Sequence, residues 1–599
     1  PDARSFVPAD TVVYMEISDL NELVDSADTA YQDLGLAELT GSGSLRSLIN
    51  GVLAEIDPAI SLDSFSPDLP LGLAIQPVAN DEDPLDSDMR VRVMLPAVDP
   101  EQLDAAFAAA VERDPDGAPQ IAVVGDYLIL YDAELPSSDL RPASTLDLSS
   151  MSAIGAGSLS YYVNVAQLRE QGLMDSESPM DVEGVDLFAG LTAVLGGTIL
   201  TPEFSRSTVA FAAEEDTLLS RLAAELQPSG NLTDLTSYLR ADAMFNSISA
   251  VDAGDAFALY WEWFEELLED MGMGGIATER LSQLTELSAE AFGGQSAASF
   301  SFDLQGLISL AMEEQDPNAD APNQADPMGM TPPGMDPEFF GALIEELDAQ
   351  GHIYMSLGSV DAFEELLQVY QDPEFIRELL QKQLASWQDG ATHLYDPDER
   401  LGELNQMLDL MSMMDIYLDF SPAQTPAGLD IQRVQPVLSF TGDDFMMSIV
   451  TGLASEILGQ LEVYLGVQDD EAVLTIGSDG PSSIDLLLSG QGFGELSVAS
   501  DASYGELLSA LPEDSFLFAN MRLGWVSDLL AVMAEQDEAG DMLSNLVPQF
   551  GDGPGLALFA GARDGMLTTG GLARIEDIGS LVMPLTMFFM ISSATAGPM

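Results

Sequence analysis

Cysteine is absent from all 599 residues. This excludes disulfides, thiol catalysis, cysteine-ligated zinc and iron–sulfur clusters. Histidine is nearly as scarce, with His352 and His393 in separate segments and no H-E-x-x-H pairing. No serine lies in a G-x-S-x-G elbow, and the glycine-rich stretch Gly272–Gly275 lacks the lysine of a phosphate-binding loop. We therefore expect a protein that is not an enzyme.

Basic residues are scarce as well: 18 lysines and arginines, with Lys382 as the single lysine, oppose 101 aspartates and glutamates. The net charge of −83 repels the phosphates of nucleic acids and anionic lipid surfaces, so neither is expected as a partner. Carboxylate repulsion also opposes the compact state, and molar salt relieves it because the Debye length falls to about 3 Å. We interpret the composition as halophilic adaptation. The simpler explanation of the acid excess is that these side chains form a solvation layer and that no binding site lies among them.

A long hydrophobic run is missing too. The longest, Ile578–Ser593, contains Pro584 and is shorter than the ~20 residues of a membrane-spanning helix. We expect no transmembrane segment and interpret this run as a buried terminal strand or helix, with docking on a partner as the alternative. Because the chain begins at Pro1 rather than Met, we expect a processed, extracytoplasmic protein that is secreted, periplasmic or at the cell surface. The alternative is the cytoplasm of a cell that accumulates salt.

A short unit of strand, capping residue and amphipathic helix recurs along the chain. In its first occurrence Thr11–Ile17 is rich in β-branched and aromatic residues, Ser18 and Asp19 can cap a helix, and Leu20 to Ala27 place apolar residues on one helical face. The same pattern pairs four more strands and helices: Met244–Val251 with Tyr260–Leu267, Ala298–Phe302 with Leu304–Ala311, Ile353–Leu357 with Val360–Leu367, and Phe516–Met521 with Val526–Met533. Repetition of this unit predicts an α+β fold.

A larger duplication is expected to contain these units. The first half runs through Thr11–Ile17, Met89–Leu95 with helix Pro100–Val111, the hairpin Ile121–Tyr131 and Ser158–Val165. The second half follows the same order through His352–Leu357, Ile431–Phe440 with helix Asp444–Leu458, the hairpin Val463–Ile476 and Phe516–Met521. Residues 315–337 between them have the Asp, Pro, Gly and Met composition of a linker. We predict two related α+β halves, 1–314 and 338–599, each a largely antiparallel sheet backed by helices.

Two strand starts carry a family resemblance. The segments Phe6–Tyr14 (FVPADTVVY) and Leu511–Phe516 (LPEDSF) resemble the Pro-Ala-Asp strand starts of a domain-of-unknown-function family of bacterial exported proteins. The segment Val123–Leu130 (VVGDYLIL) is similar to the central hairpin of that family. The resemblance implies an extracytoplasmic α+β protein and assigns no catalytic residue.

Acidic residues gather in two segments that also contain proline or glycine and are expected to be loops. Calcium accepts about 6–8 oxygen ligands in flexible geometry, which such loops can provide without an EF-hand spacing. The candidate metal ligands are Asp81, Glu82, Asp83, Asp86, Asp88, Asp175, Glu177, Asp181, Glu183 and Asp186. Plain solvation of these loops is the alternative to a Ca²⁺ site.

The scarcity of catalytic residue types and the repetitive construction favour an exported structural or interaction protein. Self-association is the expected partnership, in a surface or filamentous assembly. One alternative is a binding protein with an apolar cavity for lipid or another small ligand, and another is a hydrolase that uses two carboxylates. With 101 acids, the sequence singles out no carboxylate pair.

Overall fold

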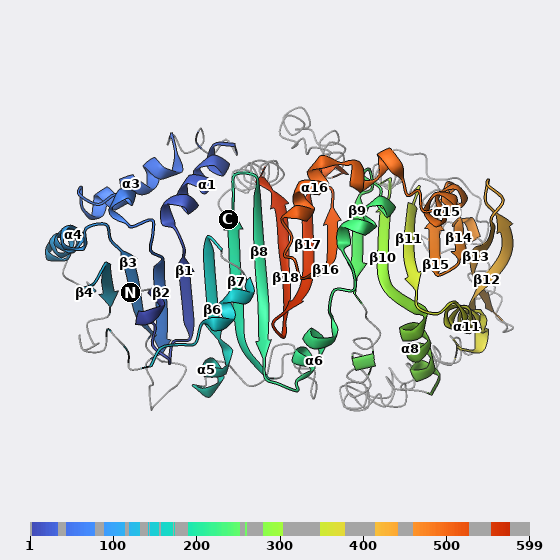
Figure 1. Ribbon diagram of the computed structural model, residues 1–599, viewed down its shortest axis with the longest axis horizontal. Coiled ribbons are helices and arrows are strands. Elements are labelled where there is room, and N and C mark those ends of the chain that lie inside the picture. The colour runs from blue at the N-terminus through green and yellow to red at the C-terminus, as the bar shows by residue number, and fades with distance from the viewer. Residues whose placement is uncertain are drawn as a thin grey trace, which may run out of the picture.

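The computed structural model in Figure 1 describes residues 3–33, 43–77, 89–113, 119–131, 144–154, 157–171, 190–251, 279–303, 348–375, 414–440, 459–525 and 553–575, with single positions at 37, 140, 142, 173, 258–259, 261 and 377.

Eighteen strands in this part of the chain form one antiparallel sheet. From one end to the other the strands are β4 (Gln120–Val124), β5 (Tyr127–Tyr131), β3 (Met89–Pro96), β2 (Leu71–Pro77), β1 (Val13–Ile17), β6 (Leu159–Asn164), β7 (Leu191–Leu200), β8 (Phe204–Ala213), β18 (Met566–Arg574), β17 (Leu556–Arg563), β16 (Ser515–Met521), β9 (Phe245–Ala250), β10 (Phe292–Ser301), β11 (Gln350–Leu357), β15 (Glu471–Ile476), β14 (Val463–Gln468), β13 (Asp430–Phe440) and β12 (Met414–Gln424). The expected α+β class and antiparallel pairing are confirmed.

Helices lie along the sheet in separate groups (Figure 1). The α-helices are α1 (Leu20–Asp33), α3 (Leu45–Ile56), α4 (Pro100–Arg113), α5 (Val165–Glu170), α6 (Leu218–Glu225), α8 (Glu279–Ala291), α11 (Val360–Gln371), α15 (Gly480–Leu488) and α16 (Ala502–Ser509). Short 3₁₀ helices are η1 (Ala3–Phe6), η2 (Leu62–Ser64), η5 (Ser149–Ile154), η6 (Leu232–Tyr238), η7 (Gly494–Leu496) and η8 (Val498–Ser500).

Two of the five strand–helix units are confirmed in full. Strand β1 leads into α1, and the Asp19 carboxylate accepts hydrogen bonds from the backbone N–H groups of Asn21 and Glu22 at 2.8 and 3.0 Å. Strand β11 leads into α11, where the Ser359 side chain accepts from Ala362 N–H. Strands β9, β10 and β16 confirm the other three expected strands. Two of their expected helices, Leu304–Ala311 and Val526–Met533, lie outside the described residues, and of the third, Tyr260–Leu267, only Trp261 is described, in helical conformation.

Both expected hairpins are confirmed. Strands β4 and β5 turn at Gly125–Asp126, where Gly125 has φ 66°. Strands β14 and β15 turn at Asp469–Asp470, where Asp469 has φ 52°. A two-residue hairpin favours left-handed backbone in its loop, which glycine and aspartate tolerate better than branched residues.

The hydrophobic core lies on both faces of the sheet. Tyr127 is buried in a cluster with η1 and η5, whereas Leu128 beside it is buried in a cluster with α4. Toward the other end, Val473 packs with η6, α15 and α16, and its neighbour Ala472 packs with α8 and α11. Successive strand residues point to opposite faces, so these pairs show that helical segments cover both sides.

Hydrogen bonding continues across the region where the sequence suggested a domain boundary. Strands β10 and β11, which precede and follow residues 315–337, are direct neighbours. Strands β16 and β18 from the end of the chain pair with β9 and β8. The expected linker itself lies outside the described residues.

Candidate functional site

The ten acids expected to hold Ca²⁺ lie outside the described residues, at positions 78–88 and 174–189. In the part of the chain that the structure describes, no group of three or more histidines, aspartates and glutamates is arranged to hold a metal ion. The expectation of a Ca²⁺ site therefore stays a prediction. His393 and Lys382 also fall outside the described ranges.

His352 lies in β11 and is 2% exposed. Its Nε2 is 2.6 Å from the carbonyl oxygen of Tyr238, and its ring lies 4.7 Å from that of Phe493. Burial lowers the pKa of His352 from 6.5 to about 4, because the charged form loses its hydration. The imidazole is therefore neutral near pH 7 and fastens β11 to η6.

A buried polar cluster lies beside His352 and joins four distant segments of the chain. This "α16 polar cluster" consists of Asn246 in β9, Ser299 in β10, Tyr504 in α16 and Asn520 in β16. The Ser299 hydroxyl donates to Asn246 Oδ1 at 2.5 Å. The Nδ2 groups of Asn246 and Asn520 both donate to the Tyr504 hydroxyl, at 3.2 and 2.9 Å. These contacts tie the start of α16 to the centre of the sheet.

Arg240 and Asp242 form the margin of this cluster. Two hydrogen bonds of 3.0 and 2.8 Å join the Arg240 guanidinium to the Asp242 carboxylate. The bonds to Arg240 hold the pKa of Asp242 below its usual value. The backbone of Arg240 also enters the cluster, because its N–H donates to Ser299 Oγ and its carbonyl accepts from Asn246 Nδ2.

The α16 polar cluster has a structural role. The Ser299 hydroxyl donates to an amide oxygen rather than to a base, so the cluster provides no activated nucleophile. Burial raises the pKa of Tyr504, which keeps its phenol neutral. The neighbouring cavity between His352, Asp479 and Ser483 measures about 10 Å³, close to the smallest space that holds one water molecule.

A second polar cluster, which is partly buried, lies beside β1. This "η1 polar cluster" consists of Arg4, Tyr14 and Glu16. The Arg4 guanidinium donates twice to the Glu16 carboxylate, at 3.0 and 2.9 Å, and the Tyr14 hydroxyl donates to it at 2.6 Å. Nearby, the buried Arg92 in β3 donates from its guanidinium to the carbonyl of Phe6 at 2.6 Å. In this cluster the charged partner Arg4 compensates for the burial of the Glu16 carboxylate.

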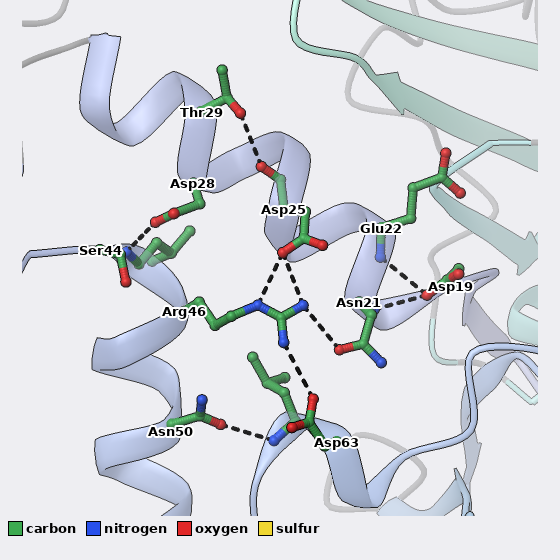
Figure 2. Close-up of polar contacts among 12 residues, drawn as sticks. Asp19, Asn21, Glu22, Asp25, Asp28, Thr29, Ser44, Arg46, Asn50 and Asp63 are labelled. Carbon is green, nitrogen blue, oxygen red and sulfur yellow. Dashed lines mark hydrogen bonds and ion pairs between the residues drawn. The ribbon is translucent and has the colours of Figure 1, made fainter.

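Acidic side chains elsewhere share the few arginines. Figure 2 shows Arg46 of α3 between Asp25 and Asn21 of α1 and Asp63 of η2. Its guanidinium donates to Asp25 at 2.9 Å, to Asn21 at 3.1 Å and to Asp63 at 3.4 Å. Because the Asp25 and Asp63 side chains are 65% and 88% exposed, water and salt screen these pairs, and they position the helices more than they stabilise them.

An open pocket of about 230 Å³ lies where α16 faces the ends of β8 and β18. Its lining combines apolar side chains with charged ones: Pro202, Phe204, Leu507, Ile575, Glu203, Glu506 and Arg574. Pockets for drug-sized ligands usually measure about 300–1,000 Å³ and are mostly apolar. This pocket is smaller and more polar than the lipid cavity considered as an alternative function.

Sequence reasoning missed both polar clusters. Tyr14 and Glu16 did leave a signal, because they alternate with apolar residues on a strand and share one face of it. Asn246 likewise lies on the inward face of strand β9. Asn520 lies on the inward face of β16 in the same way. Tyr504 left no such signal, since it lies on a helix and its partner Asn246 is 258 positions away in the sequence.

Comparisons with known proteins return no match: no family model, curated protein or solved structure is similar to this chain. The family resemblance of Phe6–Tyr14 therefore stays a prediction. Among the described helices, none is both long and apolar enough to cross a membrane.

Proposed function

We propose that this chain is an exported, non-catalytic interaction protein adapted to salt, which associates with further copies of itself through its sheet. The observation that carries the proposal is the form of that sheet. Within the described residues, its end strands β4 and β12 each pair with one neighbouring strand only. A strand edge offers a row of N–H and C=O groups to another strand. The net charge of −83 supports the saline setting.

A duplication of one ancestral unit is part of the proposal, and the strand order supports it. Outward from the central β8–β18 pair, one side runs β8, β7, β6, β1, β2, β3, β5, β4. The other side runs β18, β17, β16, β9, β10, β11, β15, β14, and the hairpin β12–β13 follows at its end. Each strand of the first series thus has a counterpart in the second.

The pairing registers support the same correspondence. Leu195 pairs with Ala210 in β7–β8, and Ala557 pairs with Leu572 in β17–β18, each 362 positions later (557 − 195 and 572 − 210). At the centre Thr208 pairs with Gly570, which again lies 362 positions later (570 − 208). Counterpart residues therefore face each other there, as across the two-fold axis of a symmetric dimer.

Equivalent hydrogen bonds recur outside the strands. Beside β1, Ala9 N–H donates to Ser144 O at 3.2 Å, and beside β9, Ala241 N–H donates to Leu496 O at 2.8 Å. The reciprocal bonds run from Leu146 to Val7 and from Val498 to Leu239, at 3.1 and 3.0 Å.

Two buried basic side chains agree with this arrangement. Arg92 on β3 bonds to the carbonyl of Phe6, and His352 on β11 bonds to that of Tyr238. The donors occupy counterpart positions on counterpart strands, and so do the acceptors. The same type of contact at counterpart positions is expected of a duplicated unit and is not expected of two unrelated ones.

The duplication so defined has a boundary after β8, in residues 214–231, rather than in residues 315–337. The first module covers residues 3–213 and the second module residues 232–575. The sequence comparison matched the two hairpins, and also β6 with β16, as the strand order does. The sequence pattern paired β1 with β11 and β3 with β13, whereas the strand order favours β9 and β11 as the counterparts of β1 and β3.

Association state at high salt tests the proposal. Light scattering and electron microscopy of native protein, from about 0.1 to 3 M sodium chloride, should show particles that grow with protein concentration as salt screens the acidic surface. A chain that stays monomeric at every salt and protein concentration would contradict self-association. Co-purification of a small molecule with such a monomer would favour the ligand-binding alternative.

A further inference from the structure

We propose that strand β4 of one copy pairs with strand β12 of the next, so that the sheet continues from copy to copy in a filament. The inference rests on the proposed self-association and on the duplication. Its starting point is the counterpart of β4. In the second module that counterpart, β14, is covered by β13, with Val463 opposite Val434 and Leu465 opposite Gln432. The same edge thus accepts an antiparallel strand in one of the two modules.

The backbone of β4 is suited to the same addition. Val124 and Tyr127 flank the two-residue turn and form a hydrogen-bonded pair, so hydrogen bonding alternates along the hairpin. The N–H and C=O groups of Ile121 and Val123 therefore point away from β5. Strand β4 has the sequence QIAVV and contains neither a charged residue nor a proline, the residues that usually prevent an exposed edge from pairing with another strand. The Val123 side chain is 42% exposed.

Strand β12 offers the complementary edge at the other end of the sheet. Thr425 N–H donates to Leu429 O and closes the β12–β13 hairpin, which makes Ala423–Ile431 the next hydrogen-bonded pair. Positions 416, 418, 420 and 422 then direct their backbone groups outward. Pro422 occupies an outward position, where its missing N–H removes no bond to β13. Three consecutive outward positions, 416 to 420, keep an N–H to donate.

The direction of the strands also fits. All neighbouring strands of the sheet are antiparallel, and the eighteen strands are even in number, so β4 and β12 run in opposite directions. A second copy in the same orientation therefore brings its β4 antiparallel to β12 of the first. Because the two edges belong to different surfaces, the contact is heterologous and can repeat from copy to copy, which a filament requires. The charge of −83 on each copy opposes it until salt screens the repulsion.

Two proline variants test the pairing, one at each edge. Val123→Pro removes an outward N–H from β4 and should leave the β4–β5 bonds in place. Leu418→Pro does the same on β12. Val467→Pro, at the counterpart of Val123 on β14, is the matched control with the same substitution on an inner strand. Thermal unfolding of each variant checks that it folds.

In roughly 3 M sodium chloride, the wild-type chain and Val467→Pro should form particles, while Val123→Pro and Leu418→Pro should each stay monomeric. An equal mixture of the two edge variants should form dimers only, because each contributes one intact edge. Edge variants that assemble as the wild type does would overturn the pairing and leave self-association standing. A wild-type chain that is monomeric at every salt concentration would overturn both.

Discussion

The η1 polar cluster and the α16 polar cluster, which the proposed duplication makes equivalent, bury polar groups by opposite means. Near β1 a carboxylate, Glu16, is held by the charge of Arg4 and by Tyr14. Near β9 neutral amides and hydroxyls bond to one another. Under the proposed duplication Asn246 and Ile248 are the counterparts of Tyr14 and Glu16, so equivalent places in the two modules would bury polar groups of different chemistry.

The difference is useful because charged and neutral clusters respond differently to substitution, pH and salt. A partly exposed ion pair, such as Arg4–Glu16, depends on screening by salt. A neutral network depends on geometry, since every donor and acceptor needs a partner. Four measurements follow from this contrast.

The largest effect is expected for Asn246→Ala. It removes three hydrogen bonds, to Ser299, Tyr504 and the Arg240 carbonyl, and leaves buried groups without partners. Denaturant unfolding should show a loss of about 4 kcal/mol. The matched change in the other cluster, Tyr14→Phe, removes one hydroxyl bond and should cost about 1 kcal/mol. Equal costs would show that the neutral cluster is no more cooperative than the charged one.

Acid should destabilise the His352 side of the molecule. The pKa of His352 falls from 6.5 in the unfolded chain to about 4 in the folded one, so between these values the unfolded state binds more protons. Stability should be complete above pH 6.5 and fall by up to about 3 kcal/mol as pH approaches 4. His352→Gln should flatten this part of the unfolding profile. Arg92→Gln removes the other buried base that bonds to a backbone carbonyl, and it should leave the slope unchanged because an arginine side chain does not titrate between pH 4 and 7. A wild-type profile parallel to that of His352→Gln would refute the assignment.

Calcium should act on the N-terminal part of the chain. All ten candidate ligands, from Asp81 to Asp186, belong to it. Calcium at a hundred times its dissociation constant would stabilise the fold by about 2.7 kcal/mol. Melting in millimolar calcium is compared with melting in sodium chloride of matched ionic strength, and with a variant in which Asp81, Asp83 and Asp86 become asparagine. Equal melting temperatures in the two salts would leave these loops as solvated acid.

The smallest expected effect is a difference in how salt concentration changes the cost of a substitution in each of the two clusters. Because the Arg4 side chain is 42% exposed, salt partly screens its pair with Glu16. The cost of Glu16→Gln should shrink by up to about 1 kcal/mol between 0.1 and 2 M sodium chloride. The cost of Asn246→Ala should stay constant. Melting of the parent chain serves as the reference, and its midpoint should rise with salt as carboxylate repulsion is screened.

Local structure was predictable from the sequence, because its causes are local. The alternation in Thr11–Ile17 and the cap at Asp19 predicted β1 and α1, and paired strand patterns around Gly125–Asp126 predicted the hairpin β4–β5. The insertion of β16, β17 and β18 between β8 and β9 was not predictable. That pairing joins residues such as Thr208 and Gly570, and no local pattern records a partner so distant.

The candidate site was predictable only where a strand revealed it. Glu16 stands out as an acid on the inward face of β1. Asn520 is polar on a strand as well, but its role depends on Tyr504, which a separate helix brings to it. Other acidic members of the site were not predictable, because with 101 acids the composition gives no means to tell a buried carboxylate from a solvated one.

The β8–β18 junction has a consequence for synthesis. During translation β8 emerges long before β18, so the growing chain carries an exposed sheet edge until β18 has been made. Contacts between residues so far apart in sequence are slow to form, and an open edge in the meantime invites aggregation. The like charges spread along the chain keep such unfinished molecules apart. The acidity that we propose to be an adaptation to salt would thus also protect the nascent polypeptide until β18 has been made.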